Sequence, residues 1–284
     1  MTLSVVIITC NEEENLPRTL ASVEQLVRDL GGEIIVVDSG STDRTVEIAK
    51  SFGAKVFVEE WKGFAAQKNS AIEKASGEWV LLLDADEDVE LELANEIVME
   101  FKLLEACRRY THETKAALEQ ELGIEDLFKT NFDDRDPNCV GLFIPRKNFF
   151  LNRWIKHGGF WPDRKLRIFK RAAGRVEERT VHETIKVDGP TATLNGALIH
   201  HAYPTLSAYI EHMNRYSSLG AEMAGPRSFS FIDIFIRPRL TFLYNYFLRL
   251  GFLDGREGFL LHLYHSVYVS WKYAKAWELS RKSK

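Results

Sequence analysis

Short apolar runs alternate with stretches of helical periodicity through the first hundred residues. Runs of the Val-, Ile- and Leu-rich kind that form buried parallel strands cover residues 3–9, 33–37, 54–58 and 79–83. Between them, apolar residues recur at helical spacing, and glycines mark helix ends. This alternation predicts a mostly parallel sheet with helices on both faces. Right-handed crossovers then bring the carboxyl ends of the strands to one edge.

Polar side chains stand at these strand ends. Thr9 ends the first run, Asp38 follows the second, and Asp84-Ala85-Asp86 follows the fourth. Ligands of open α/β sheets bind in the crevice beyond the carboxyl ends. Mg²⁺ and Mn²⁺ are held by one or two carboxylates together with substrate phosphates. The Asp-x-Asp triplet therefore indicates a site for a cation and phosphates, although taken alone it also fits a solvated acidic turn.

Two further segments, residues 38–43 and 63–76, can each be interpreted in a structural or a functional way. Asp38 opens a turn of small polar residues, 38–43, which favour turns and helix caps. Asp38 either serves that turn or accepts a hydrogen bond from a nucleobase N–H beside side chains small enough to admit the ring. Lys68 and Asn69 fall on a predicted helix over residues 63–76, where they either face solvent or contact the same base or phosphate.

From residue 140 the pattern changes to short strands, such as residues 141–146 and 165–169. Period-two alternation in the second places Arg167 on one face with Lys165 and Phe169. Arg167 then faces either water or the cleft, where its guanidinium would clamp a diphosphate.

Two further segments are open to more than one interpretation. Residues 102–138 are rich in charge and predict a helical insertion over the acceptor side or a solvated helix pair. An apolar strand is predicted over residues 193–199, directly before His200 and His201. These histidines either shape an acceptor pocket, help to hold a metal, or pack as structural side chains.

Four segments carry a family resemblance: residues 8–13, 37–43, 63–69 and 83–87. In order and spacing they resemble family 2 glycosyltransferases, and later segments resemble the bacterial branch that includes lipopolysaccharide-core β-1,4-glucosyltransferases. The resemblance implies an α/β fold of the GT-A (Rossmann-like) type, with a mixed, mostly parallel sheet. It also implies a UDP-sugar donor, a glycan or glycolipid acceptor, and Mg²⁺ or Mn²⁺ as cofactor.

The resemblance and the residue patterns together assign roles to individual side chains. Contacts to the nucleotide sugar are expected from Thr9, Asn11, Glu12, Asp38, Lys68, Asn69, Asp84 and Arg167. Asp86 and Asp84 are the expected metal ligands. Cys10 stands where the family usually has an aromatic residue, so the usual base-stacking side chain is missing.

The segment Val181-His182-Glu183 is expected to be catalytic. An inverting transferase needs one carboxylate to take the proton from the acceptor hydroxyl as it attacks, unlike the carboxylate pairs of glycoside hydrolases. The resemblance assigns this role to Glu183. His182 would orient Glu183, bind the acceptor or pack.

The C-terminal segment differs in charge from the rest. From residue 226 onward it holds ten basic and four acidic residues, which leaves 27 basic and 37 acidic residues elsewhere. Residues 229–277 are crowded with aromatic and aliphatic side chains, with predicted helices over 240–250 and from 257. These helices either pack on the catalytic domain or lie on an anionic membrane surface.

The expected organisation follows from these segments. A catalytic domain covers residues 1–225, divided into a nucleotide-sugar half (1–100), a helical insertion (101–138) and an acceptor and catalytic-base half (139–225). Residues 226–284 form amphipathic basic-aromatic helices as a C-terminal appendage.

The location expected is cytoplasmic, peripheral at the inner face of the cytoplasmic membrane. Three scattered cysteines indicate a reducing compartment. The N-terminus has no basic region before its first apolar run, and no run reaches the roughly 20 apolar residues of a membrane span. No nucleic-acid partner is expected.

The predicted function is inverting, metal-dependent transfer of a hexose, glucose being favoured, from a UDP-sugar to a lipid-linked or lipopolysaccharide-core glycan. One alternative is a sugar-phosphate nucleotidyltransferase. Such an enzyme prefers a basic, Gly-rich loop after the first strand, where this chain has Glu12-Glu13-Glu14. A second alternative is a non-catalytic, membrane-associated scaffold that binds nucleotide sugars.

Overall fold

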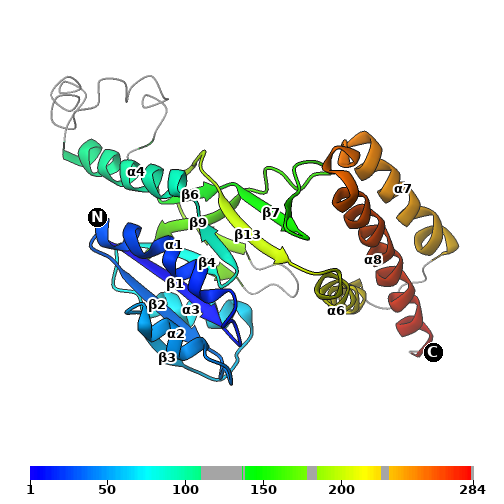
Figure 1. Cartoon of the computed structure of the whole chain (residues 1–284), viewed down its shortest axis with the longest axis horizontal. Helices are drawn as coiled ribbons and strands as arrows, with labels where there is room; N and C mark the ends of the chain where they lie inside the picture. The colour runs from blue at the N-terminus through cyan, green and yellow to red at the C-terminus, as the bar shows by residue number, and fades with distance from the viewer. Residues whose placement is uncertain (110–135, 137, 178–183, 225–229, 283–284) are drawn as a thin grey trace. The chain divides into compact units, whose positions relative to one another are not determined.

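The computed structural model describes residues 1–109, 136, 138–177, 184–224 and 230–282 (Figure 1). Within these residues the chain divides into two compact units. The first draws on Met1–Pro145, Arg164–Glu177 and Thr184–Leu198, and the second on Arg146–Asp163 and Ile199–Lys284. The sequence predicts a division by function, into a catalytic domain up to residue 225 and a C-terminal appendage. The division into compact units does not test that boundary, which stays a prediction.

The first unit is built on a seven-stranded sheet with the order β12-β6-β9-β4-β1-β2-β3. Strands β1 to β4 are parallel to one another, whereas β9 runs antiparallel to both β4 and β6. The mostly parallel, mixed sheet expected from the sequence is therefore confirmed. Its strands are β1 (Leu3–Thr9), β2 (Glu33–Asp38), β3 (Lys55–Val58), β4 (Trp79–Asp84), β6 (Gly141–Ile144), β9 (Lys165–Lys170) and β12 (Thr191–Thr193).

Both faces of this sheet are covered. Alternate residues of β1 enter two separate cores: Val5 and Ile7 pack in one, Val6 and Ile8 in the other. The first core also takes side chains from α1 (Leu16–Asp29), α2 (Thr45–Ser51) and α4 (Leu91–Arg109). The second takes them from α3 (Phe64–Glu73) and from the hairpin of β10 (Gly174–Glu177) and β11 (Thr184–Val187). Helices on both faces are thus confirmed.

The strand register brings the expected polar residues to one edge. Thr9 at the end of β1 pairs with Asp38 at the end of β2, and Ile8 pairs with Asp84 at the end of β4. Three polar side chains from distant parts of the sequence therefore stand at adjacent strand ends, as the alternation of strands and helices predicts.

The strand predicted over residues 193–199 is wrong. A turn at Asn195 and Gly196, whose N–H groups donate to the carboxylate of Glu96, interrupts that run. β13 instead covers Leu198–Tyr203, so His200 and His201 lie within a strand. Of the insertion expected over residues 102–138, the first eight residues form the end of α4, and most of the rest falls outside the described residues.

The second unit joins a small sheet to a group of helices. β13 lies next to β7 (Arg146–Phe150), which pairs with β8 (Arg153–Trp154). Three long helical stretches follow: α6 (Leu206–Ala224), a run of π and α turns through η4 (Ile232–Ile236), α7 (Arg237–Leu243) and η5 (Tyr244–Leu248), and α8 (Gly255–Lys282). A short 3₁₀ turn, η6 (Gly251–Asp254), connects the last two.

The first C-terminal helical run begins at Ile232, well before the predicted start at residue 240, whereas its end and the start of the second helix lie close to the positions expected. Leu250, in a left-handed conformation at φ 59°, ends the first helical run, and α8 starts two residues before the predicted Glu257. α7 and α8 lie side by side as a hairpin (Figure 1). None of the helices in the described part of the chain combines the length and the apolar character that a membrane crossing requires.

Candidate active site

The Asp-x-Asp turn is anchored to the body of the first unit. β4 ends at Asp84 and β5 (Glu87–Val89) begins three residues later. The hydroxyl of Thr19, buried on α1, donates to the carbonyl oxygen of Ala85 at 2.7 Å. The Asp84 backbone N–H donates to the Glu87 carboxylate at 3.2 Å. These contacts fix the direction of the turn, so its carboxylates sit on a rigid support.

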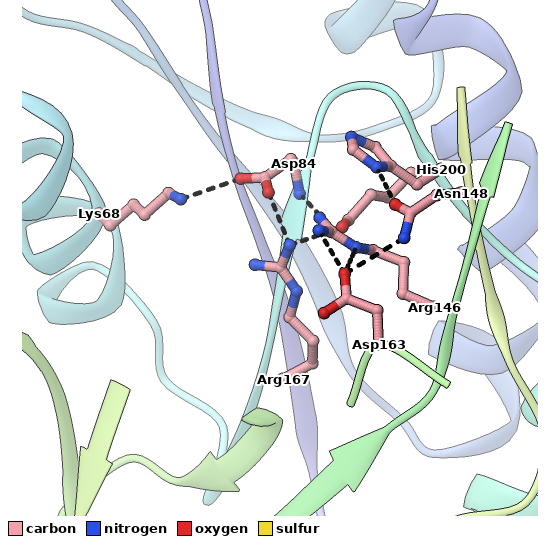
Figure 2. A network of polar contacts seen from close by, with 8 residues as sticks. Lys68, Asp84, Arg146, Asn148, Asp163, Arg167 and His200 are labelled. Atoms are coloured by element: carbon pink, nitrogen blue, oxygen red, sulfur yellow. Dashed lines mark hydrogen bonds and ion pairs between the residues drawn. The ribbon is translucent and has the colours of Figure 1, made fainter. Parts of the chain in front are cut away.

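Two cations bracket Asp84 (Figure 2). Lys68 Nζ lies 2.9 Å from Oδ1, and Arg167 Nη2 lies 2.6 Å from Oδ2. Burial on its own raises the pKa of Asp84, but Arg167 and Lys68 outweigh that effect and hold the pKa well below its usual range. Asp84 is therefore ionised at neutral pH, and both of its oxygens contact protein cations.

Arg167 does not face water: it is 6% exposed, and the same Nη2 also donates to Oε1 of Glu87 at 2.6 Å. Glu87 is fully buried. Sequence reasoning gave Glu87 no role, although a carboxylate at the start of a buried strand needs a cationic partner. The alternation along residues 165–169 predicts the face of β9 on which Arg167 lies, but it does not identify Glu87 as the partner of Arg167.

Negative charge accumulates beside this turn. Burial raises the pKa of Glu12, and the neighbouring carboxylates of Asp86, Asp43 and Asp84 raise it further. A hydrogen bond from Asn15 Nδ2, at 2.9 Å, acts in the opposite direction. Glu12 and Asp86 thus lie close enough to repel one another, and a cation between such groups relieves the repulsion.

Asp38 is occupied by its own turn. Its Oδ1 accepts the backbone N–H groups of Gly40 at 2.9 Å and Ser41 at 2.8 Å. Its Oδ2 accepts the hydroxyl of Thr9 at 3.0 Å and that of Ser41. A carboxylate has about four lone-pair positions, and all four are used here. Asp38 organises the turn, and its contact with a base stays a prediction.

Asn11 and Asn69 also have structural tasks. Asn11, at φ 55°, accepts the Thr42 N–H on its Oδ1 at 2.8 Å and so joins the loops that follow β1 and β2. The Asn69 side-chain amide makes two hydrogen bonds to the backbone of Val176, at 2.8 and 2.9 Å. Nucleotide contacts by these two side chains stay predictions.

The carboxylates present would supply only part of the ligand shell of a Mg²⁺ or Mn²⁺ ion. Among the described residues no group of three or more His, Cys, Asp or Glu side chains is arranged to hold a metal. Hard cations in phosphate-transfer sites take one or two carboxylates and complete their shell with substrate oxygens and water. Asp86, half-buried beside Glu12, suits that partial role.

The catalytic pair expected from the sequence, His182 and Glu183, lies outside the described residues. In the second unit, His200 Nδ1 is 2.7 Å from Oδ1 of Asn148 (Figure 2), and the ring of His201 stacks on Phe149 with centroids 5.6 Å apart. Both histidines therefore have structural partners within their own sheet.

Parts of the chain or nearly all of it are similar to known proteins. Residues 4–120 match the sequence model of the family described as Glycosyl transferase family 2. An uncharacterized glycosyltransferase of Rickettsia typhi is 29% identical over 99% of this chain and 89% of its own length. The lipopolysaccharide core biosynthesis glycosyltransferase LpsC of Rhizobium meliloti is 28% identical over 97% of this chain and 92% of its own.

Solved structures also share sequence with a part of the chain. Glucosyl-3-phosphoglycerate synthase from Mycobacterium tuberculosis, in complex with Mn²⁺, UDP and glucosyl-3-phosphoglycerate, is 33% identical over 30% of this chain and 34% of its own. The TM-score of 0.29 is too low to establish a common fold.

Proposed function

We propose that the chain transfers a hexose from a UDP-sugar to a lipopolysaccharide-core glycan, with inversion at the anomeric carbon, because residues 4–120 match the sequence model of glycosyltransferase family 2. Glucose is the favoured hexose. Similarity to a lipopolysaccharide core glycosyltransferase over 97% of the chain supports the acceptor class. The cations and carboxylates that lie together at the sheet edge support the donor class, because they suit a diphosphate and a divalent ion.

One observation carries the proposal: side chains from four separate segments converge at the carboxyl edge of the parallel strands. Lys68 and Arg167 contact Asp84, and the nearby carboxylate of Asp86 helps to raise the pKa of Glu12. A nucleoside diphosphate would bring two negatively charged phosphates to this edge, where cations would neutralise them. The edge also carries carboxylates, whose charge a metal ion would neutralise. The two requirements are met together when a divalent ion joins the phosphates to the protein.

Within this site the two aspartates of the triplet take different roles. Asp84 already contacts Lys68 and Arg167, so it positions these two cations at the cleft edge. Asp86 is the carboxylate we assign first to the metal, with Glu12 as its neighbour. A bound Mg²⁺ or Mn²⁺ would act as a Lewis acid that stabilises negative charge on the departing diphosphate.

Glu183 is the proposed general base on the grounds of sequence. The acceptor hydroxyl gives its proton to the Glu183 carboxylate, and the hydroxyl oxygen forms a bond to the anomeric carbon. The bond from that carbon to the β-phosphate oxygen breaks on the opposite face, and UDP leaves. Retained turnover in Glu183→Gln would exclude this role.

The test is hydrolysis of a panel of nucleotide sugars with Mn²⁺ or Mg²⁺ and without acceptor. We expect one UDP-hexose to be hydrolysed, and chelator to reduce the rate about a hundredfold or more. Asp86→Ala should lose the metal-dependent rate. Asp29→Ala, at an exposed aspartate of α1, is the matched control and should keep it.

Three results would contradict the proposal: full activity of Asp86→Ala in chelator, no hydrolysis of any nucleotide sugar, or release of pyrophosphate from UTP and a sugar phosphate. The last result would indicate a nucleotidyltransferase. The loop after β1 argues against that class, because it carries Glu12, Glu13 and Glu14 where a basic phosphate loop would be needed.

A further inference from the structure

The C-terminal hairpin exposes a continuous series of large apolar side chains. Between Phe231 and Leu253 more than half of all residues are large, apolar and exposed. We call this series the apolar ridge, and it consists of Phe231, Ile232, Phe235, Ile236, Leu240, Leu243, Tyr244, Phe247, Leu248, Leu250, Phe252 and Leu253. Exposed apolar side chains on soluble proteins are usually scattered, so a series of this extent indicates an interaction surface.

Helical spacing places five residues of the ridge on one side of its helical run. Ile232, Ile236, Leu240, Leu243 and Phe247 follow one another at intervals of three or four residues, which is the period of a single helical face. The run packs against α8 within the second unit, where Pro238 of α7 is buried (Figure 1). The face that carries these five residues is therefore exposed, away from the packed side of the hairpin.

The charges around the ridge are positive. Residues 234–253 contain no Asp or Glu, but they contain Arg237, Arg239 and Arg249. The guanidinium of Arg239 lies 3.3 Å from the ring centroid of Phe235, and that of Arg249 lies 5.7 Å from the ring centroid of Tyr244. Because Arg239 and Arg249 lie over aromatic rings of the ridge, their positive charges lie next to the apolar surface.

The acidic residues that flank this stretch are already engaged. Asp233 pairs with Arg237 at 2.9 Å and accepts the N–H of Ser230. Asp254 is buried and accepts the backbone N–H groups of Lys156 and His157. Neither offers a partner to Arg239 or Arg249.

We propose that the apolar ridge inserts into the headgroup region of an anionic lipid bilayer, with Arg239 and Arg249 on the lipid phosphates. Aromatic and aliphatic side chains bordered by arginine suit that boundary, because one end of each contact is apolar and the other is anionic. The proposal concerns a lipid surface and does not depend on which sugar the first unit transfers.

A second copy of the chain fits this surface less well. Pairing of two ridges about a two-fold axis would bring the arginines of both copies to the same border. Residues 234–253 supply no carboxylate to neutralise them. An anionic lipid surface supplies a negative group for each arginine, so charge complementarity favours lipid.

Two lysines of α8, Lys272 and Lys275, count among the basic residues of the C-terminal segment but do not belong to this surface. Lys275 Nζ donates to Asn214, Ser217 and Ser218 of α6. The side chain of Lys272 packs beside Gly220 of the same helix. Both lysines therefore join α8 to α6 and are only partly exposed. Arg249 also packs close to a glycine, Gly159, but it stays exposed, as Arg239 does, so the attraction to anionic lipid falls to these two arginines.

Flotation of the full chain with lipid vesicles tests the proposal without any sugar donor. We expect the protein to float with vesicles of phosphatidylcholine containing about one third phosphatidylglycerol, and to bind phosphatidylcholine alone about tenfold more weakly. Leu248→Glu should bind the mixed vesicles at least about tenfold more weakly than the wild type. Leu91→Glu is its matched control and should bind normally, since Leu91 and Leu248 are both 76% exposed.

A second pair of variants separates charge from apolar contact. Arg239→Gln should weaken binding to the mixed vesicles and leave binding to phosphatidylcholine unchanged, whereas Arg28→Gln, at an exposed arginine of α1, should change neither. Circular dichroism confirms that each variant is folded.

Two results would overturn the proposal. One is vesicle binding by Leu248→Glu equal to that of Leu91→Glu, including the case in which neither they nor the wild type bind. The other is a wild-type dimer, in the absence of vesicles, that Leu248→Glu converts to a monomer, because the ridge would then be an interface between two copies.

Discussion

Arg167 and Lys68 each contribute a positive charge to Asp84, and Arg167 shares its charge with Glu87. The cluster contains two carboxylates and two cations, so it is close to neutral by itself. Glu12 and Asp86 add two further carboxylates beside this cluster. A neutral, rigid cluster beside two further carboxylates is an arrangement that holds a cation without repelling the phosphates that accompany it.

Glu87→Gln tests the role of the buried carboxylate. Removal of one charge from a buried pair leaves Arg167 with a single counter-charge, and breaking such a pair costs about 3 kcal/mol or more. We therefore expect the free energy of unfolding to fall by about that amount in urea titrations at pH 7. Donor hydrolysis should fall as well, because Glu87 also holds the backbone of Asp84.

The matched control for this variant is Glu92→Gln, at an exposed glutamate in the first turn of α4. It should change the free energy of unfolding by less than about 0.5 kcal/mol. Equal stability of the two variants would show that the charge on Glu87 does not hold Arg167 in place.

The residues of the site were predictable to different degrees. Asp84 and Arg167 were both found from their strand ends and alternation, but the contact between them joins residues 83 positions apart and has no local signal. Asn69 was assigned to the nucleotide because a polar residue on a helix shows no partner in the sequence. Its two bonds to Val176 exist only after the β10 hairpin packs on α3.

At the level of elements, Glu33 joins three neighbouring segments at the opposite edge of the sheet. Its carboxylate accepts hydrogen bonds from Ser4 of β1, from the N–H and hydroxyl of Ser76 after α3, and from Lys55 of β3. Burial raises the pKa of Glu33, but these hydrogen bonds outweigh it and lower the pKa from 4.5 to about 2.

This shift predicts a pH-dependent contribution to stability. A carboxylate whose pKa is lower in the folded state stabilises the fold above its unfolded pKa and loses that effect as pH falls through the folded value. Glu33→Gln should therefore be less stable than the wild type by about 2 kcal/mol at pH 7, with the difference closing between about pH 4.5 and pH 2.

Urea titrations at a series of pH values measure this difference. Glu24→Gln, at an exposed glutamate of α1, serves as control and should follow the wild type at every pH. A difference between Glu33→Gln and the wild type that stays constant as the pH falls would show that the charge of Glu33 does not contribute.

The elements themselves were well predicted where the pattern was long. The apolar runs of β1 and β4 were predicted as strands and form buried central strands, apart from the partly exposed Asp84 at the end of β4, whereas the strand expected over residues 193–199 was misplaced. In that segment a tertiary contact decides the boundary: a Cβ on Gly196 would lie 2.6 Å from Cα of Leu93 in α4, so the chain turns there. A single sequence does not reveal such a close approach.

At the scale of the whole molecule, the chain combines two units with different surfaces. The first presents carboxylates and cations at the carboxyl edge of a parallel sheet, and the second presents the apolar ridge. Alternation of strands and helices predicted the first arrangement, and composition alone indicated the second. Which side of the C-terminal helices is exposed follows only from how α7 and α8 pack.

The measurement that tests the acidic edge most directly is calorimetric titration of UDP into the wild type and Asp86→Asn, with Mn²⁺ and with chelator. The wild type should bind UDP about tenfold or more tightly with Mn²⁺ than in chelator, and Asp86→Asn with Mn²⁺ should bind as weakly as the wild type in chelator. Equal affinity of the wild type in both conditions, or unchanged Mn²⁺ dependence in Asp86→Asn, would contradict a nucleotide and metal site at this edge.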